Sequence, residues 1–175
     1  MTVNYPAATA SDNCSTQPAI TYSKASGTSF GLGTTTGTVT ATDASGNSSQ
    51  CSFKVNVVYS WSGVLQPINA NANDPSVFKL GTTVQVKFEL TGASAGIAKA
   101  VAKLSYTKLP VNIPPGPVNE ATSTAAATSG NLFRYDTKAK QYIFNWGTKS
   151  LTAGVYELKI DLGDGVSRTV NIVLK

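Results

Sequence analysis

Apolar and polar residues alternate in several short runs of this chain, and this alternation limits the possible fold more than any other feature. In residues 83–91 every second residue is apolar, and its neighbours are polar or charged. A period of two places the apolar side chains on one face of a β-strand. Gly, Pro, Asp and Asn separate such runs at short intervals, as they do in antiparallel proteins with many turns. The sequence therefore predicts an all-β protein.

Residues 37–58 contain the clearest hairpin pattern. The alternating run 37–42 is followed by Asp-Ala-Ser-Gly-Asn at 43–47. Asp and Asn bond to nearby backbone in turns, and Gly tolerates a positive φ. The return strand is therefore expected over 49–58, and a further strand is expected at 19–23.

Residues 59–175 carry further strand patterns, at the spacing that is typical of a β-sandwich. The four prolines in 109–117 exclude a central strand there, because proline has no N–H for the ladder. Strands are expected at 77–80, 83–91, 98–108, 132–135, 141–146, 155–162 and 167–174. The side chains of the last two strands that are expected to face the core are Tyr156, Leu158, Ile160, Val170, Ile172 and Leu174.

The composition excludes several kinds of site. The chain has no His and only two Cys, so it can form neither a Ser-His-Asp triad nor a four-thiolate zinc site. It has no P-loop motif and no apolar run long enough to span a membrane. We therefore expect a protein that is not an enzyme, needs no cofactor and does not insert into a membrane.

The formal charge of +5 is contributed by residues 59–175, because residues 1–58 hold two Lys and two Asp. The lysines are scattered singly, as on solvated strand faces. Only Arg134 and Arg168 can bind a phosphate through two hydrogen bonds. No nucleic-acid partner is expected.

The two cysteines lie in different surroundings. Cys14 is in a polar segment, whereas Cys51 shares the alternating face of the return strand with Phe53. This arrangement indicates a disulfide that pins a loop to a core strand, with two unpaired thiols as the alternative. A disulfide would indicate an oxidising compartment, and therefore a secreted or cell-surface protein.

The order of motifs in residues 2–58 resembles that of a hyalin repeat (HYR) domain. The segments that carry the resemblance are Tyr5-Pro6-Ala7, Ala10–Ser15, Gly33–Thr36, Thr40–Asn47 and Cys51-Ser52-Phe53. The resemblance implies an immunoglobulin-like β-sandwich from an extracellular, often adhesive, multidomain protein. It also implies that Cys14 and Cys51 form one of the family's bridges.

Two departures from the HYR pattern bear on the fold. The positions of a second cysteine pair hold Tyr22 and Val39. The family's first strands have no counterpart in residues 1–58, so the sandwich is expected to be short of an edge strand. Either the domain is a shortened one, or another strand completes its sheet.

Residues 59–175 resemble the PxKD module of bacterial exported proteins. The resemblance rests on 59–63, 65–69, 76–81, 129–136 and 160–165. Gln85 stands where the family name expects Pro. The resemblance implies no activity and no functional residues.

Four local patterns suggest specific sites, and each pattern also has a purely structural explanation. Asp43, Ser45 and Asn47 have the spacing of a cation loop but also suffice for a turn. Asp161 and Asp164 are the nearest carboxylate pair for acid–base catalysis, although turn chemistry explains Asp164.

The other two patterns concern a cross-link and a glycan site. Lys87, Glu89 and Asn171 supply the residue types of an isopeptide cross-link, on faces that we expect to be solvated. Exposed aromatic residues could stack on sugar rings, but filling of the core is the commoner role of such residues. The candidates for stacking are Trp61 and Trp146, together with Tyr142 and Tyr156.

Taken together, the sequence predicts two tandem immunoglobulin-like antiparallel β-sandwiches, at 1–58 and 59–175. The expected function is that of a non-enzymatic structural or adhesive module of a larger exported bacterial protein, with other protein modules or neighbouring subunits as partners. The alternatives are a carbohydrate-binding module that binds glycans, and a filament-type subunit that a neighbour's strand completes.

Overall fold

A computed structural model describes residues 1–13, 17–71, 73–110, 119–123 and 130–175. It divides the chain into two compact units, Met1–Val58 and Tyr59–Lys175. Apart from one short 3-10 helix, η1 (Gly92–Ser94), the regular elements of the described residues are all β-strands. The predicted all-β class is therefore confirmed. No helix in these ranges has the length and apolar character needed to cross a membrane.

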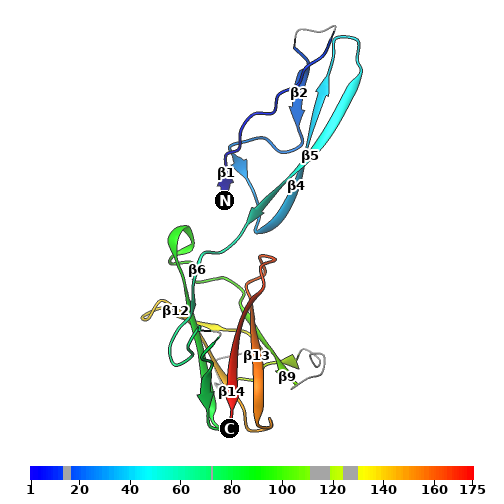
Figure 1. Ribbon diagram of the computed structural model, residues 1–175. Coiled ribbons are helices and arrows are strands. Elements are labelled where there is room, and N and C mark those ends of the chain that lie inside the picture. The colour runs from blue at the N-terminus through cyan, green and yellow to red at the C-terminus, as the bar shows by residue number, and fades with distance from the viewer. Residues whose placement is uncertain (14–16, 72, 111–118, 124–129) are drawn as a thin grey trace. The chain divides into compact units, whose positions relative to one another are not determined.

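The first unit is built on one antiparallel sheet (Figure 1). Its strands β2 (Ala19–Tyr22), β4 (Gly33–Thr42) and β5 (Ser48–Val57) lie in the order β2-β4-β5. β4 and β5 pair along their whole length, from Gly33 opposite Val57 to Thr42 opposite Ser48. This pairing confirms the predicted hairpin.

The rest of the first unit adds little buried volume. The strands β1 (Thr2–Val3) and β3 (Thr28–Ser29) form a separate two-residue ladder. Among the described hydrophobic side chains of this unit, only Phe30 and Val39 are buried, at 1% and 8% exposed. The first unit therefore presents one layer of sheet with a very small core.

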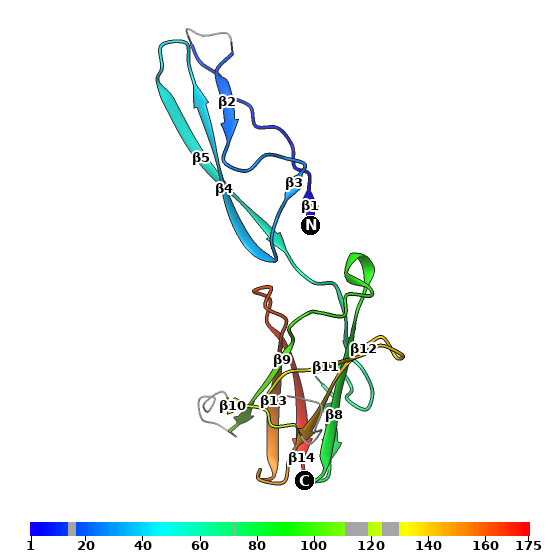
Figure 2. The ribbon, with the colours of Figure 1, turned by 180° about the vertical axis from the view of Figure 1, so that it is seen from behind.

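The second unit is a sandwich of two sheets (Figures 1 and 2). Its five-stranded sheet has the order β10-β9-β13-β14-β7, and its four-stranded sheet has the order β11-β12-β8-β6. Among the strands in the described ranges of this unit, all pairs are antiparallel except β14 with β7, which is parallel. The bounds are β6 Trp61–Val64, β7 Ser76–Phe78, β8 Thr83–Leu90, β9 Lys103–Leu109, β10 Asn119–Glu120, β11 Arg134–Asp136, β12 Gln141–Gly147, β13 Gly154–Asp161 and β14 Arg168–Leu174.

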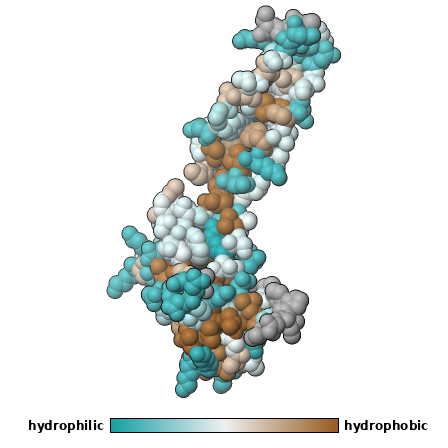
Figure 3. All heavy atoms as spheres, in the orientation of Figure 1, coloured by the Kyte–Doolittle hydropathy of each residue, from teal (hydrophilic) through white to brown (hydrophobic). Residues whose placement is uncertain are grey.

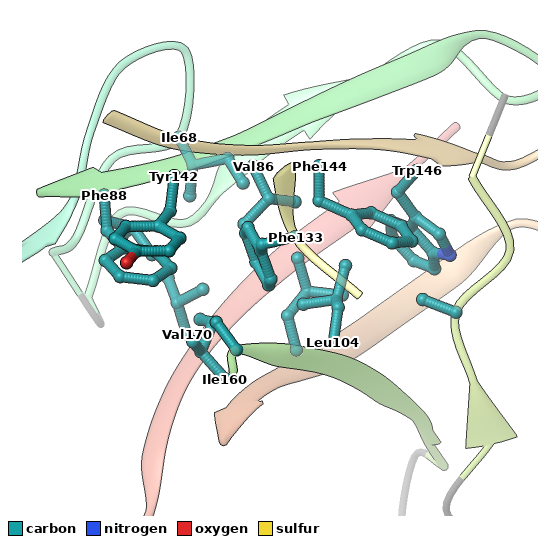
Figure 4. Close-up of a cluster of buried hydrophobic side chains, with 14 of the residues drawn as sticks. Ile68, Val86, Phe88, Leu104, Phe133, Tyr142, Phe144, Trp146, Ile160 and Val170 are labelled. Atoms are coloured by element: carbon teal, nitrogen blue, oxygen red, sulfur yellow. The ribbon is translucent and has the colours of Figure 1, made fainter. Parts of the chain in front are cut away.

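The core of the second unit lies between the two sheets, and alternation selects its side chains. Every second residue of β8, beginning at Val84, is buried, and so are all six inward-facing residues predicted for the last two strands. Figure 4 shows aromatic rings stacked within this core, with Phe88 and Tyr142 parallel at 4.9 Å between centroids.

One predicted strand begins later than expected. β9 begins at Lys103 instead of residue 98, because the backbone before it bonds elsewhere. The Ala100 N–H donates to the Tyr142 hydroxyl, and the Ala102 carbonyl accepts from the Phe133 N–H. Both alanines are buried as loop residues.

Candidate functional site

One face of the first unit's sheet is apolar and only partly covered. Tyr22, Val39, Phe53 and Val55 share this face through the β2-β4-β5 register. An extended N-terminal segment crosses it, and its Tyr5 ring lies 4.8 Å from Phe53 and 6.0 Å from Tyr22 between centroids. This segment covers part of the face in place of a second sheet.

The contacts of the N-terminal segment are few but well defined. The Tyr5 hydroxyl donates to the Lys24 carbonyl, and the Ala8 N–H donates to the Tyr22 hydroxyl at 2.6 Å. Burial, followed by the nearby Tyr22 phenol, raises the pKa of Tyr5. The segment is therefore held at Tyr5 and Ala8.

Two adjoining cavities remain where the segment leaves the sheet open. One is about 380 Å³ and the other about 430 Å³. They share Ala8, Val39 and Cys51, so we treat them as one trough. The smaller cavity is lined by Tyr5, Pro6, Ala8, Tyr22, Val39, Cys51, Phe53, Lys54 and Val55. Figure 3 shows apolar residues interrupting the polar surface on the visible side of this unit.

The trough reaches the free edge of the sheet. Among the described residues, β5 pairs with β4 alone and is an edge strand of ten residues. Lys54 lines the trough although alternation places its side chain on the other face from Phe53. The trough is apolar in its smaller cavity, whereas the larger cavity is lined by many polar residues, Asp12 and Asp43 among them. This trough, beside a long unpaired strand edge, is the main candidate site of this chain.

The turn of the hairpin explains the proposed cation residues without a cation. One Asp43 carboxylate oxygen accepts the Ser45 and Asn47 N–H groups, and the other accepts the Asn47 side-chain amide at 2.8 Å. The side-chain hydrogen bond from Asn47 is the main cause that lowers the pKa of Asp43. Within the described ranges, no three His, Cys, Asp or Glu side chains gather in the manner of a metal site.

The disulfide stays a prediction, because Cys14 lies outside the described residues. Cys51 is on β5, opposite Val39, and its side chain is exposed. The expectation that Cys51 belongs to a packed core is therefore wrong, since the sheet face around it is the open trough.

The two tryptophans of the second unit differ from the exposed platforms that stacking on sugar requires. Trp146 is 1% exposed, and Tyr106 and Tyr156 lie against it. Trp61 is half-buried, with the Arg168 guanidinium carbon 5.5 Å from its ring centroid. Trp146 therefore offers no exposed ring face, and Arg168 lies over the Trp61 ring. Tyr142 and Tyr156 are also buried.

The two candidate arginines and the carboxylate pair have structural roles. Arg168 is buried and donates from both terminal nitrogens to Asp164, at 2.8 and 2.6 Å, so it is not available to a phosphate. Arg134 lies 3.6 Å from Asp136. Asp161 accepts from the Gly163 N–H in the same turn as Asp164. We find no acid–base arrangement in this pair.

The isopeptide residues lie on different faces. Lys87 points outward from the four-stranded sheet, whereas Asn171 points outward from the five-stranded sheet, because their neighbours in sequence are the core residues. The core of the sandwich separates them, so this cross-link is excluded.

The sequence predicts a sheet short of an edge strand, but it does not identify β5 as the unpaired strand or Tyr5 as the residue that covers part of the apolar face. A signal for Tyr5 was present, since an aromatic residue in a short polar segment seldom lies isolated. Which strand is left unpaired had no local signal, because strand order is a property of the whole sheet.

A comparison with protein families finds that the HYR domain model matches residues 1–57. A search of curated proteins finds no match to the chain. HYR domains are extracellular domains of the adhesion type. The first unit is thus similar to an HYR domain over its whole length, and the second unit follows it in the same chain.

Proposed function

We propose that this chain is a non-enzymatic contact and spacer segment of an exported bacterial protein. In this proposal the HYR-like unit binds another polypeptide, and residues 59–175, as a PxKD-type sandwich, hold that unit at a distance from the rest. A bridge between Cys14 and Cys51 is part of the proposal, since it would strengthen a unit with so small a core. The observation that carries the proposal is the trough beside the free edge of β5.

The chemistry of this surface favours an extended strand as the partner. An unpaired strand edge offers alternating N–H and C=O groups, which another extended backbone satisfies. The smaller cavity has one charged lining residue, Lys54, and is otherwise uncharged. Where it lies over the smaller cavity, the partner strand should therefore have apolar side chains at alternate positions and no charge on that face.

A strand of a different polypeptide fits better than a second copy of this chain. Pairing of β5 with another β5 would place two sets of Cys51, Phe53 and Val55 side by side. That arrangement would double the open apolar face instead of covering it, which soluble proteins avoid. A filament of identical subunits joined in this way is thus the less favoured alternative. No observation favours glycan binding over this proposal.

The register shows how to block the edge without breaking the hairpin. Thr38 exchanges hydrogen bonds with Ser23, on the β2 side of β4. Backbone N–H and C=O groups alternate in direction along a strand, so those of Val39 point to β5 and pair there with Cys51. The backbone groups of Cys51 therefore point to β4, and the N–H of Ser52, the next residue, points to the free edge. Ser52→Pro therefore removes an edge donor and leaves the β4–β5 ladder in place.

The test is NMR titration of the labelled chain with an uncharged alternating Thr-Val octapeptide. We expect shifts of the β5 amides, loss of those shifts in Ser52→Pro, and none with a peptide of the same composition whose four Thr precede its four Val. Absence of β5 shifts, or equal shifts with both peptides, would overturn the proposal. If light scattering shows a dimer that Ser52→Pro abolishes, the partner strand belongs to a second copy of this chain and not to a different polypeptide.

A further inference from the structure

We propose that the second unit bears tension along the chain, through two sets of contacts that hold its two ends. One set is the parallel pair β7–β14, and the other joins Tyr59 to Asp164 and Arg168. This inference rests on the spacer part of the proposed function and gives it a mechanical basis.

The first set of contacts joins an early strand to the last one. Ile172, Val173 and Leu174 of β14 lie opposite Ser76, Val77 and Phe78 of β7. Beyond these strands, the Lys175 N–H donates to the Phe78 carbonyl at 3.0 Å, and the Leu80 N–H donates to the Lys175 carbonyl at 2.6 Å. The pairing therefore continues to the last residue of the chain described here.

The parallel direction decides how this pairing responds to tension. The N-terminal side of β7 leads back to Tyr59, and the C-terminal side of β14 ends at Lys175. Tension on Tyr59 reaches β7 through β6, which pairs with β8 in the other sheet. Once β6 is released, tension between Tyr59 and Lys175 pulls the parallel neighbours β7 and β14 in opposite directions along their own axes. In this shear geometry the hydrogen bonds between the strands are loaded together rather than one after another.

The second set of contacts holds the backbone where the second unit begins, and we call it the Tyr59 clamp. The Tyr59 N–H donates to Asp164 at 2.9 Å, and the Tyr59 carbonyl accepts from Arg168 at 3.0 Å. The Asp164 and Arg168 side chains are 0% and 5% exposed. Charge-assisted hydrogen bonds with two points of contact are strong and geometrically specific.

The two sets act at opposite ends of the unit. Arg168 is the first residue of β14, whereas Lys175 follows its last residue. β14 has seven residues, which extend about 20 Å in a strand. Figure 1 shows the C terminus at the tip of the β14 arrow. Tension therefore enters at the Tyr59 clamp and leaves at the β7–β14 pair.

The test compares two directions of pulling on the full chain by single-molecule force spectroscopy. Handles at residues 1 and 175 load β7–β14 in shear. In the second geometry, one handle is attached at residue 79 through an azido amino acid and the other at residue 175. These handles pull β7 and β14 apart from their shared C-terminal end, so that their hydrogen bonds break one after another. Unfolding of Tyr59–Lys175 is recognised in the first geometry by a gain of about 40 nm. The first unit gives about 20 nm without the proposed Cys14–Cys51 bridge and about 7 nm with it.

We expect an unfolding force in the shear geometry at least about twice that in the other geometry, because several hydrogen bonds must break together. Equal forces, or a lower force in shear, would overturn the inference. The handle at residue 79 replaces the exposed Lys79, so the comparison needs only one surface replacement in the second unit.

A pair of variants tests the Tyr59 clamp. Asp164→Asn should lower the shear force, whereas Asp161→Asn, an exposed change in the same turn, should not. If Asp164→Asn fails to fold by tryptophan fluorescence, Tyr59→Pro takes its place: it removes the N–H donor, together with the ring that packs against the core, and should lower the force. An unchanged force in a folded clamp variant would remove the clamp from the inference.

Peptide binding at β5 is measured in the other unit, so failure of that proposal is distinguishable from failure of this one.

Discussion

Gly37 shows how a single residue decides whether the first unit can form its sheet. Gly37 lies opposite Phe53 across the β4–β5 ladder, and the Phe53 ring covers it. A Cβ added at Gly37 would lie 2.4 Å from the Phe53 ring. Gly37→Ala should therefore destabilise the first unit by about 1–3 kcal/mol, since the ring must leave its place over the sheet. Hydrogen exchange of β4 and β5 peptides measures the change. The matched control is Gly31→Ala, because a Cβ there meets nothing within 4 Å; equal effects of the two variants would show that the Phe53 contact is not the cause.

The turn between β13 and β14 is the element whose charge state matters most. Burial by itself would raise the pKa of Asp164, but hydrogen bonds from Arg168 and from the Tyr59 and Val166 N–H groups outweigh it and hold the pKa at about 2. A carboxyl with a lowered pKa in the folded state contributes stability above its unfolded pKa of about 4. That contribution, about 2 kcal/mol, should be lost as the pH falls from about 4 towards 2. Urea unfolding followed by tryptophan fluorescence reports on this unit, because both Trp residues lie in it. Asp164→Asn should be less stable at pH 7 and should lack this acid-dependent step. A variant with the same pH dependence as the unmodified chain would assign that step to another group.

At the scale of the whole molecule, the two units differ most in how much apolar surface they bury. The first unit buries Phe30 and Val39, whereas the sandwich core of the second unit contains more than twenty buried residues. Apolar burial is the main source of folding stability, so the first unit should unfold at a lower urea concentration. Hydrogen exchange at increasing urea should show β2, β4 and β5 opening first, while β8 and β12 remain protected. If both units lose protection together, either the first unit has another source of stability or the two fold as one.

Reduction provides a further test at this scale. If Cys14 and Cys51 are bridged, a reducing agent should lower the free energy of unfolding of the first unit by about 2–4 kcal/mol. Its urea midpoint should fall accordingly, while that of the second unit stays unchanged. Intact mass with and without thiol labelling under denaturing conditions shows directly whether the bridge exists. Labelling of both thiols before reduction would contradict the bridge and the compartment inferred from it.

Alternation in the sequence determined the strands and the inward-facing side chains of the second unit, and turn residues at 43–47 determined the hairpin of the first. Both patterns are local, because side-chain direction in a strand repeats every two residues and turn chemistry acts over four or five residues. Tertiary structure alone decided that Trp146 is buried, that Arg168 is held by Asp164, that β7 lies parallel to β14, and that β5 is left as an edge beside an open trough. These features depend on which strands become neighbours, and residues distant in the sequence determine that order by packing together.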